Sequence, residues 1–231
     1  MESEHQDRVH TYFESQAATW EDRYRHDAAV KDRIARFEAA LRRHAIHEGA
    51  VLDLGCGSGR IIRSLARDGF SMTGADISSR MLDMARNEPA GDQVRWVLQD
   101  ARQPFPLPLS AAQFDAVISS SMLEYLTDPK AALVEMARLL RPEGWAFFTV
   151  PDPRHPKRVR ERWQQSMLRF APLRSLAKLT PARNYTLYLE LSVTRPALDR
   201  WATLATEAEL SVPPIGPCSD PLALIEAQKP S

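Results

Sequence analysis

Short apolar runs alternate with segments of helical periodicity through the middle of the chain. Each run is bounded by glycine or polar residues, which predicts a buried β-strand. Residues 60–66 and 79–86, which follow the first two runs, predict helices. Strands that alternate with helices favour an α/β fold, built on a parallel sheet with right-handed crossovers. The five predicted strands are residues 51–54, 70–76, 94–99, 114–119 and 145–150.

The pattern changes after the fifth strand. Residues 152–184 have helical spacing, and residues 185–193 and 222–227 predict two late strands. Thr194 and Pro196 are suited to begin a helix between those strands, as a cap and an early-turn proline. One domain is expected over residues 1–231, consisting of an N-terminal helical lid (1–48), a core (49–151), a basic helical insertion (152–184) and C-terminal strands with a helix (185–231).

The first strand runs directly into alternating glycines at positions 55, 57 and 59, with Asp53 just before them. Glycine permits a sharp turn from strand to helix and lets a ligand approach the backbone without a Cβ in the way. The following helix offers unpaired N–H groups at its start. This segment predicts a ligand site at the carboxyl end of the first strand, although a tight turn that binds nothing has the same local pattern.

The glycine spacing separates the candidate ligands. A dinucleotide-binding loop has the form Gly-x-Gly-x-x-Gly, whereas Arg60 occupies the last of those positions here. A nucleotide phosphate loop ends in Gly-Lys-Ser/Thr, which this segment lacks. The form Asp-x-Gly-x-Gly-x-Gly instead resembles motif I of the class I S-adenosylmethionine-dependent methyltransferases. Four further features follow in that family's order, so the resemblance covers roughly residues 49–151.

The resemblance implies a doubly wound, mostly parallel seven-stranded sheet with helices on both faces, in which the two late strands form an edge hairpin. It also implies that Asp53 lies near the ammonium of S-adenosyl-L-methionine and that Asp100 faces the adenine. Asp76, at the end of the second strand, suits the ribose hydroxyls; a second interpretation is an N-cap for the helix that follows, and the two roles could partly coexist. The expected cofactor residues are Tyr12, Trp20, Asp53, Gly55, Cys56, Gly57, Gly59, Asp76, Ile77, Met81, Asp100, Ala101 and Ser119.

Aromatic residues are concentrated ahead of the first strand, where residues 5–18 and 28–47 have helical spacing. Tyr12, Phe13 and Trp20 have two interpretations: they dock the helix on the sheet, or they cover the cofactor and exclude water. Exclusion of water matters for methyl transfer, because a sulfonium is a charged electrophile. The segment also resembles the leader of several small-molecule methyltransferases, including those that act on porphyrins and quinone precursors.

The segment from residue 152 to residue 183 is strongly basic, with nine lysine and arginine residues against two acids. Val159, Trp163, Met167 and Phe170 fall near one helical face. Three interpretations stay open: a substrate cover that recognises an anionic group, a surface that rests on a membrane to collect a lipid-linked substrate, or an ordinary amphipathic insertion with a solvated basic face.

The composition limits which classes of binding partner and which cellular location are expected. The chain has 231 residues, is 44% hydrophobic and has no net charge, so nothing in its global charge favours sequence-specific nucleic acid binding. Cys56 and Cys218 give neither a disulfide framework nor zinc spacing. The polar, acidic start and the lack of a membrane-length apolar run predict a cytoplasmic protein. The oligomeric state is left open.

Several chemistries are disfavoured by what the chain lacks. The segment Ser119–Met122 differs from the Asn/Asp-Pro-Pro-Tyr/Phe element used to methylate nucleobase amino groups. The cysteine in the glycine loop is not free to act as a nucleophile on a pyrimidine. His44 and His47 lie beside Glu48 at ligand-like spacing on a helix end, but no further ligand is in view, so no metal site is predicted.

Methyl transfer depends mainly on positioning the nucleophile in line with the methyl group. A general base, if one is used, could be Glu124, Tyr125, His155 or Tyr185. The sequence predicts methyl transfer from S-adenosyl-L-methionine to a small-molecule or lipid-linked acceptor, at oxygen. Three alternatives stay open: an RNA or protein methyltransferase, a non-catalytic cofactor-binding module, and an NAD-dependent oxidoreductase.

Overall fold

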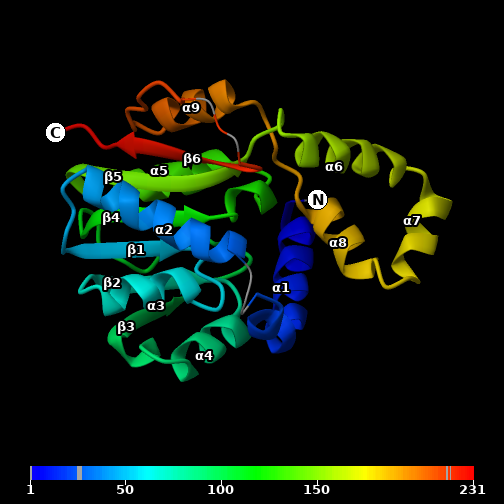
Figure 1. Ribbon diagram of the computed structural model, residues 1–231, viewed down its shortest axis with the longest axis horizontal. Coiled ribbons are helices and arrows are strands. Elements are labelled where there is room, and N and C mark those ends of the chain that lie inside the picture. The colour runs from blue at the N-terminus through cyan, green and yellow to red at the C-terminus, as the bar shows by residue number, and fades with distance from the viewer. Residues whose placement is uncertain (1, 25–27, 217, 219) are drawn as a thin grey trace.

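A computed structural model describes residues 2–24, 28–216, 218 and 220–231. Its centre is a six-stranded sheet with the order β3-β2-β1-β4-β5-β6, in which β6 is antiparallel to β5 and all the other pairs are parallel (Figure 1). The strands are β1 (Ala50–Leu54), β2 (Ser71–Asp76), β3 (Val94–Leu98), β4 (Phe114–Ser120), β5 (Leu140–Pro151) and β6 (Leu222–Gln228). The predicted α/β fold with a mostly parallel sheet is confirmed.

Helices lie on both faces of the sheet (Figure 1). The helices are α1 (Glu2–Tyr24), α2 (Ala28–Arg43), α3 (Arg60–Arg67), α4 (Ser79–Asn87), α5 (Pro129–Leu139), α6 (Pro156–Met167), α7 (Ala171–Lys178), α8 (Arg183–Leu191) and α9 (Leu198–Glu207). Two short 3₁₀ turns, Gly91–Gln93 and Leu123–Tyr125, precede β3 and follow β4.

The alternation of side chains along each strand divides the core into two layers. Leu52 and Leu54 of β1 pack into the cluster that includes α5 and α9, whereas Val51 packs into the cluster that includes Phe37 of α2 and Ile62 of α3. Both faces of these strands are therefore buried, which explains why the strands appear in the sequence as nearly continuous apolar runs.

The prediction of a seventh strand at residues 185–193 is wrong. Most of this segment is helix α8, and the described residues form six strands, with one isolated bridge from Ser211 to Gln228 beside β6. The leucines at 187, 189 and 191 alternate as in a strand, but Leu191 packs against Val9 of α1. Tertiary contact with α1 therefore outweighs the local alternation.

The predicted start of the helix after residue 193 also needs correction. The N-cap of α9 is Ala197, and the Thr194 hydroxyl instead donates to the Leu126 carbonyl. Thr194 thus ties the chain to the turn after β4. A second hydrogen bond, 3.0 Å from the Thr194 amide to the Glu124 carbonyl, strengthens this link.

Helices α6, α7 and α8 extend away from the sheet, with α8 beside α1, and we call them the arm (Figure 1). The arm follows β5, where the sequence predicts a helical insertion. No helix in the described part of the chain is long and apolar enough to cross a membrane.

The aromatic side chain of Phe37 is fully buried and docks α2 on the sheet. Phe37→Ala should lower the free energy of unfolding by about 3–5 kcal/mol, because it removes a large side chain from a packed core. Urea unfolding followed by circular dichroism measures the change. Val134→Ala, at an exposed position of α5, is the control, and an equally small loss in both variants would contradict this account of the core.

Candidate functional site

The glycine loop forms the floor of the site at the carboxyl end of β1. Gly55 has a φ of +75° and Gly59 a φ of +76°, in the left-handed region that favours glycine. A Cβ atom at Gly55 would lie 2.5 Å from Cγ of Met122, and one at Gly59 would lie 2.6 Å from the Trp96 ring. Both positions therefore require glycine for conformation and for space.

Asp76 joins the end of β2 to this loop. Its carboxylate accepts hydrogen bonds from the backbone amides of Gly57 (2.7 Å) and Ser78 (2.9 Å). The N-cap of α4 is Ser78, whose hydroxyl accepts from the Met81 amide at 3.1 Å. The alternative interpretation of Asp76 as the N-cap is therefore wrong.

Asp53 is a buried acid that lacks compensation. Its side chain lines the cavity described below, and its Oδ1 atom has no hydrogen-bond partner among the described residues. Burial raises the pKa of Asp53 to about 8, and the nearby Asp76 carboxylate adds to this rise. Burial also raises the pKa of Asp76, against the opposing effect of the Ser78 and Gly57 amides. Together, these acids make this part of the site favourable for a cationic group.

Cys56 lies between the first two glycines of the loop. Burial, with Asp76 and Asp53 close by, raises the pKa of the Cys56 thiol well above its usual value. A neutral thiol is a poor nucleophile. This agrees with the expectation that the residue does not serve as the nucleophile of a pyrimidine methyltransferase.

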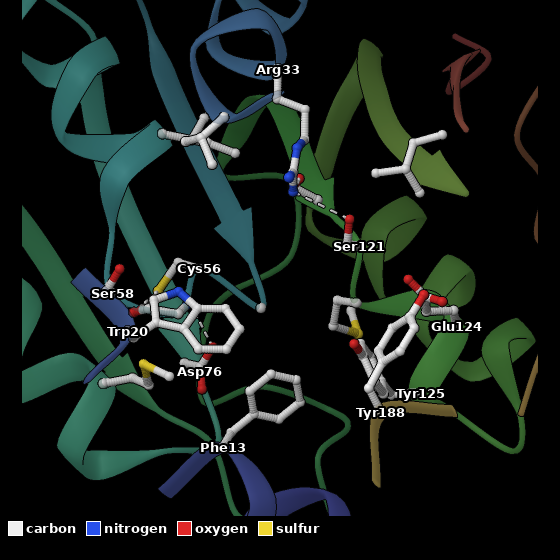
Figure 2. Close-up of a pocket in the computed structure, with 18 of the residues that line it drawn as sticks. Phe13, Trp20, Arg33, Cys56, Ser58, Asp76, Ser121, Glu124, Tyr125 and Tyr188 are labelled. Atoms are coloured by element: carbon white, nitrogen blue, oxygen red, sulfur yellow. Dashed lines mark hydrogen bonds between the residues drawn. The ribbon is translucent and has the colours of Figure 1, made fainter. Parts of the chain in front are cut away.

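A cavity of about 1020 Å³ opens above the loop. Figure 2 shows Phe13 and Trp20 near Asp76 and Cys56, with Glu124, Tyr125 and Tyr188 across the cavity from them. We call these two sides the loop half and the arm half. The expected site residues that line the cavity are Tyr12, Trp20, Asp53, Gly55, Cys56, Gly57, Asp76, Ile77, Met81, Glu124, Tyr125 and Tyr185.

Other expected cofactor residues lie outside the cavity lining. Gly59 packs under Trp96, and the buried Ser119 hydroxyl donates to the Leu54 carbonyl at 2.8 Å. Asp100 is exposed and accepts from the Arg102 amide at 2.9 Å. Ala101, which follows it, is also absent from the lining.

The residue after β3 that lines the cavity is Gln99, whose side chain is buried, and not Asp100 or Ala101. Sequence reasoning missed this residue, which lies directly after β3 and just before the expected acid. The Gln99 side-chain amide donates to the Pro104 carbonyl at 3.3 Å.

The aromatic residues of α1 form a chain of edge-to-face ring contacts. The Phe13 ring lies 5.2 Å from Tyr12, 5.8 Å from Trp20 and 5.1 Å from Tyr125. Tyr12 is buried, and all four rings line the cavity. The docking and the covering interpretations of these aromatics are thus compatible, because one set of rings packs α1 in place and borders the cavity.

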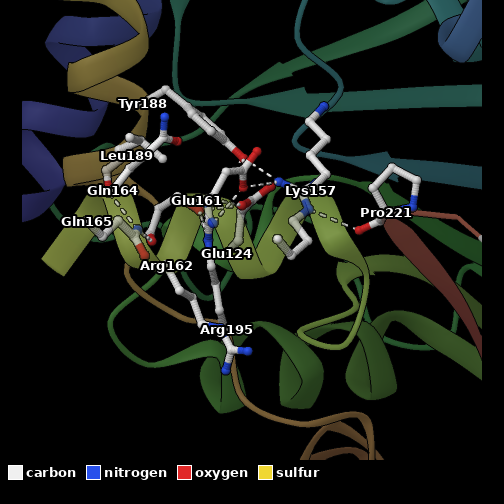
Figure 3. Close-up of polar contacts among 12 residues, drawn as sticks. Glu124, Lys157, Glu161, Arg162, Gln164, Gln165, Tyr188, Leu189, Arg195 and Pro221 are labelled. Atoms are coloured by element: carbon white, nitrogen blue, oxygen red, sulfur yellow. Dashed lines mark hydrogen bonds and ion pairs between the residues drawn. The ribbon is translucent and has the colours of Figure 1, made fainter. Parts of the chain in front are cut away.

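The arm half of the cavity contains a buried ionic cluster that the sequence analysis did not find (Figure 3). Arg195 makes an ion pair of 2.7 Å with Glu161 and one of 3.4 Å with Glu124. Arg158 pairs with Glu161 at 2.8 Å. Both arginines also donate to the Tyr188 hydroxyl. The one sequence feature that could have indicated this cluster is Glu161, because it is one of only two acids in the basic segment.

The charges of this cluster balance each other. Burial alone would raise the pKa of Glu161, but Arg158 and Arg195 hold it below its usual value. Burial, with the Glu124 carboxylate, raises the pKa of Tyr188. Glu161 is therefore ionised and Tyr188 neutral at physiological pH. Oε1 of Glu161, in contrast to Oε2, has no partner among the described residues.

The four candidate bases occupy different environments. The Ser192 hydroxyl donates to Glu124, which also faces Arg195. Tyr125 is buried against Phe13, as described above. The Tyr185 hydroxyl donates to Oε1 of Gln164 at 2.8 Å.

His155 does not line the cavity. It is the N-cap of α6, and its Nδ1 atom accepts from the Lys157 amide at 3.2 Å. The described residues contain no group of three or more side chains that could hold a metal ion.

Asp53 makes the stability of the protein depend on pH. An ordinary aspartate has a pKa of about 4 in the unfolded chain, so the folded state favours the neutral carboxyl. Its stabilising contribution is complete below that value and is lost as the pH rises through about 8.

The side chain of Asp53→Asn is neutral at every pH. At about pH 8 the free energy of unfolding of this variant should therefore exceed that of the wild type by at least ~1 kcal/mol. This difference in the free energy of unfolding should shrink as the pH falls toward about 4, as measured by urea unfolding across this range. Asp83→Asn, at an exposed position of α4, should show no such trend. A gap for Asp53→Asn that does not change with pH would refute the raised pKa.

Arg195 neutralises two buried acids. Arg195→Ala should lower the free energy of unfolding by about 3–5 kcal/mol, because it leaves Glu124 and Glu161 buried with less compensation. Arg200→Ala removes an exposed pair with Glu207 and should change stability little. Similar midpoints of thermal unfolding for the two variants would rule out a structural role for the cluster.

The sequence of this core matches known proteins. Residues 52–148 match a family model described as a methyltransferase domain. A demethylmenaquinone methyltransferase of Tropheryma whipplei is 37% identical over 130 residues, which are 56% of this chain and 52% of that protein. A ubiquinone biosynthesis O-methyltransferase of Klebsiella pneumoniae is 36% identical over 101 residues, which are 43% of this chain and 41% of that protein.

Solved structures share the fold over a longer range. The structure of Burkholderia thailandensis 1,6-didemethyltoxoflavin-N1-methyltransferase, with bound 1,6-didemethyltoxoflavin and S-adenosylhomocysteine, matches with a TM-score of 0.69 at 17% identity. The match covers 100% of this chain and 91% of that one.

The chain spans about half the length, or less, of the two curated relatives described above. The matched region contains the glycine loop, Asp76 and the turn after β4, which are the parts from which the resemblance was predicted. The predicted resemblance is confirmed: residues 52–148 match a methyltransferase domain, and the chain shares the Rossmann-like fold of a solved methyltransferase.

Proposed function

We propose that this protein transfers a methyl group from S-adenosyl-L-methionine to the oxygen of a small-molecule or lipid-linked acceptor. The observation that carries the proposal is a single cavity with two distinct halves. The uncompensated Asp53, Asp76 and the glycine loop line the loop half, and a neutralised polar cluster lines the arm half. Such a cavity can hold a cationic cofactor and a neutral acceptor side by side.

The loop half suits the cofactor. The unpaired Oδ1 atom of Asp53 fits a positively charged ammonium, which would relieve the penalty of burying that acid. Asp76 lies at the end of β2, where a carboxylate can accept both ribose hydroxyls. Gln99 is our candidate for the adenine side in place of Asp100, because Gln99 lines the cavity. Trp20 and Phe13 would exclude water from the sulfonium.

The cofactor, when bound, supplies a methyl group on an electrophilic sulfonium. The protein's contribution is to hold the acceptor oxygen in line with that group, which places most of the catalysis in positioning. Glu124 is a poor candidate for the base, because Arg195 and Ser192 engage its carboxylate. Oε1 of Glu161 accepts hydrogen bonds only, so it favours an acceptor molecule that presents an O–H or N–H group nearby.

The relatives support the acceptor class. One is named for demethylmenaquinone and the other for O-methylation in ubiquinone biosynthesis. Both names favour an acceptor of quinone or quinone-precursor type, and the second favours oxygen as the methylated atom. We further propose that residues 152–183 contact the membrane that carries such an acceptor. The four segments predicted from the sequence would form one methyltransferase domain, and the cytoplasmic location stays a prediction from the sequence.

The competing functions have less support. The glycine spacing disfavours an oxidoreductase, since Arg60 stands where a dinucleotide loop has glycine. A module that had lost its chemistry would have no need for Asp53 and Asp76 in this arrangement. An RNA methyltransferase would bind its substrate with steep salt dependence through the basic segment.

Calorimetric titration with S-adenosylmethionine, S-adenosylhomocysteine and NAD tests the proposal. Only the two adenosyl ligands should bind. Asp76→Ala should weaken that binding by about 1–3 kcal/mol, or roughly tenfold to a hundredfold, through loss of hydrogen bonds to a buried acid. Asp83→Ala is the exposed control on α4. NAD binding would favour the oxidoreductase, and no adenosyl binding at all would exclude a methyltransferase.

A further inference from the structure

Helix α6 of the arm presents its apolar side chains to solvent and buries polar ones. The two buried residues of α6 are Arg158 and Glu161, whereas Trp163 is 64% exposed. This is the reverse of an ordinary surface helix, which buries its apolar stripe. Further exposed apolar side chains follow on α7 and at its end, and we call the whole set the arm face: Val159, Trp163, Met167, Phe170, Leu176 and Leu179.

The arm face is unusual for this molecule. Eight of the eleven strongly exposed large apolar side chains in the described part of the chain lie between residues 159 and 185. Phe170 and Leu176 are each 62% exposed, and Leu179 is 85% exposed. Contiguous exposed apolar surface usually marks an interaction site.

The charges around the arm face all have one sign. Every exposed charged side chain described between residues 156 and 183 is cationic: Lys157, Arg160, Arg162, Arg169, Arg174 and Arg183. None of them forms an ion pair with a described residue. The acid of this segment, Glu161, is buried and paired with Arg158 and Arg195. The cations are therefore available to an anionic surface.

The arrangement of charge and apolar surface specifies the partner. On α6, Arg160 and Arg162 fall on opposite sides of the stripe formed by Val159 and Trp163, given 100° between successive helical residues. A helix that lies in a bilayer interface inserts its apolar stripe and places flanking cations at the level of the anionic headgroups.

We propose that the arm face docks on a membrane surface rich in anionic lipid. This inference deepens the proposed function and rests on it for its purpose: it names the surface from which a lipid-linked acceptor would enter the site. Lys157 and Tyr185 line the cavity, and α7 connects the two helices that carry them. The arm half of the cavity is therefore lined by α6, the same helix that carries Val159 and Trp163 of the arm face.

Vesicle binding tests the proposal. The full-length protein should sediment with vesicles that contain equal parts of phosphatidylglycerol and phosphatidylcholine. It should bind pure phosphatidylcholine far more weakly, and high salt should release it. Brominated lipids should quench Trp163, and Trp163→Gln should remove that part of the quenching.

Two sets of variants separate the charge from the apolar contribution. Arg160→Gln, Arg169→Gln and Arg174→Gln together should weaken binding to anionic vesicles about a hundredfold, at roughly fivefold for each charge. Trp163→Gln with Leu179→Gln should weaken it at least about tenfold, through lost apolar burial. These side chains are exposed and lie outside the cavity lining. Val134→Gln, at an exposed apolar position of α5, should bind like the wild type.

Three results would overturn the proposal. The first is equal binding to neutral and anionic vesicles, or no binding to either. The second is a stable dimer in sedimentation equilibrium that Trp163→Gln with Leu179→Gln dissociates, since the arm face would then contact a second copy of the chain. The third is salt-sensitive binding of single-stranded RNA that depends on the arginines and not on Trp163 or Leu179.

Titration with S-adenosylhomocysteine in the absence of vesicles separates this inference from the proposed function. Variants of the arm face should bind that ligand as the wild type does. Vesicle binding by a protein that does not bind the ligand would leave the docking surface intact and refute the methyltransferase function. Binding of S-adenosylhomocysteine without vesicle binding would refute the docking surface and leave the methyltransferase function intact.

Discussion

The hydrogen bond from the Gly57 amide to the Asp76 carboxylate joins the two parts of the fold on which the site depends. Parallel pairing of β1 with β2 brings their carboxyl ends to one edge of the sheet. The left-handed glycines then turn the chain sharply enough for a backbone amide to reach the acid on the neighbouring strand. Asp53 and Asp76 therefore line the same cavity from two neighbouring strands.

The two halves of the cavity treat buried charge in opposite ways. The loop half contains Asp53, whose Oδ1 atom has no partner among the described residues and whose pKa is raised to about 8, so a bound cation would stabilise its charged form. The arm half contains acids that two arginines already neutralise. The loop half therefore suits a positively charged ligand and the arm half a neutral one. Both positions exist before either ligand binds.

The features of the fold that were predicted correctly are those that depend on residues close together in the sequence. Apolar runs, the spacing of three glycines and the acid at the end of β2 are local patterns, and each led to the correct element. Helix α8 was mistaken for a strand because its leucines fit both periods, and only contact with α1 decided between them.

The ionic cluster could not be predicted for a related reason. Glu124, Glu161 and Arg195 come from the turn after β4, from α6 and from the segment after α8. Nothing in the local sequence shows that they meet. The placement of Gln99 in the cavity in preference to Asp100 depends on the direction of the chain where it leaves β3, which periodicity does not determine.

The contact between α1 and α8 has a consequence for the order of events at the site. Val9 and Tyr12 of α1 pack with Leu191 of α8, and Arg8 pairs with Glu190 at 2.8 Å. The helix that borders the loop half is thus mechanically joined to the helix that borders the arm half. If binding of one ligand changes the affinity for another through this contact, thermodynamic linkage requires the effect to be reciprocal, so that each ligand changes the other's affinity by the same factor.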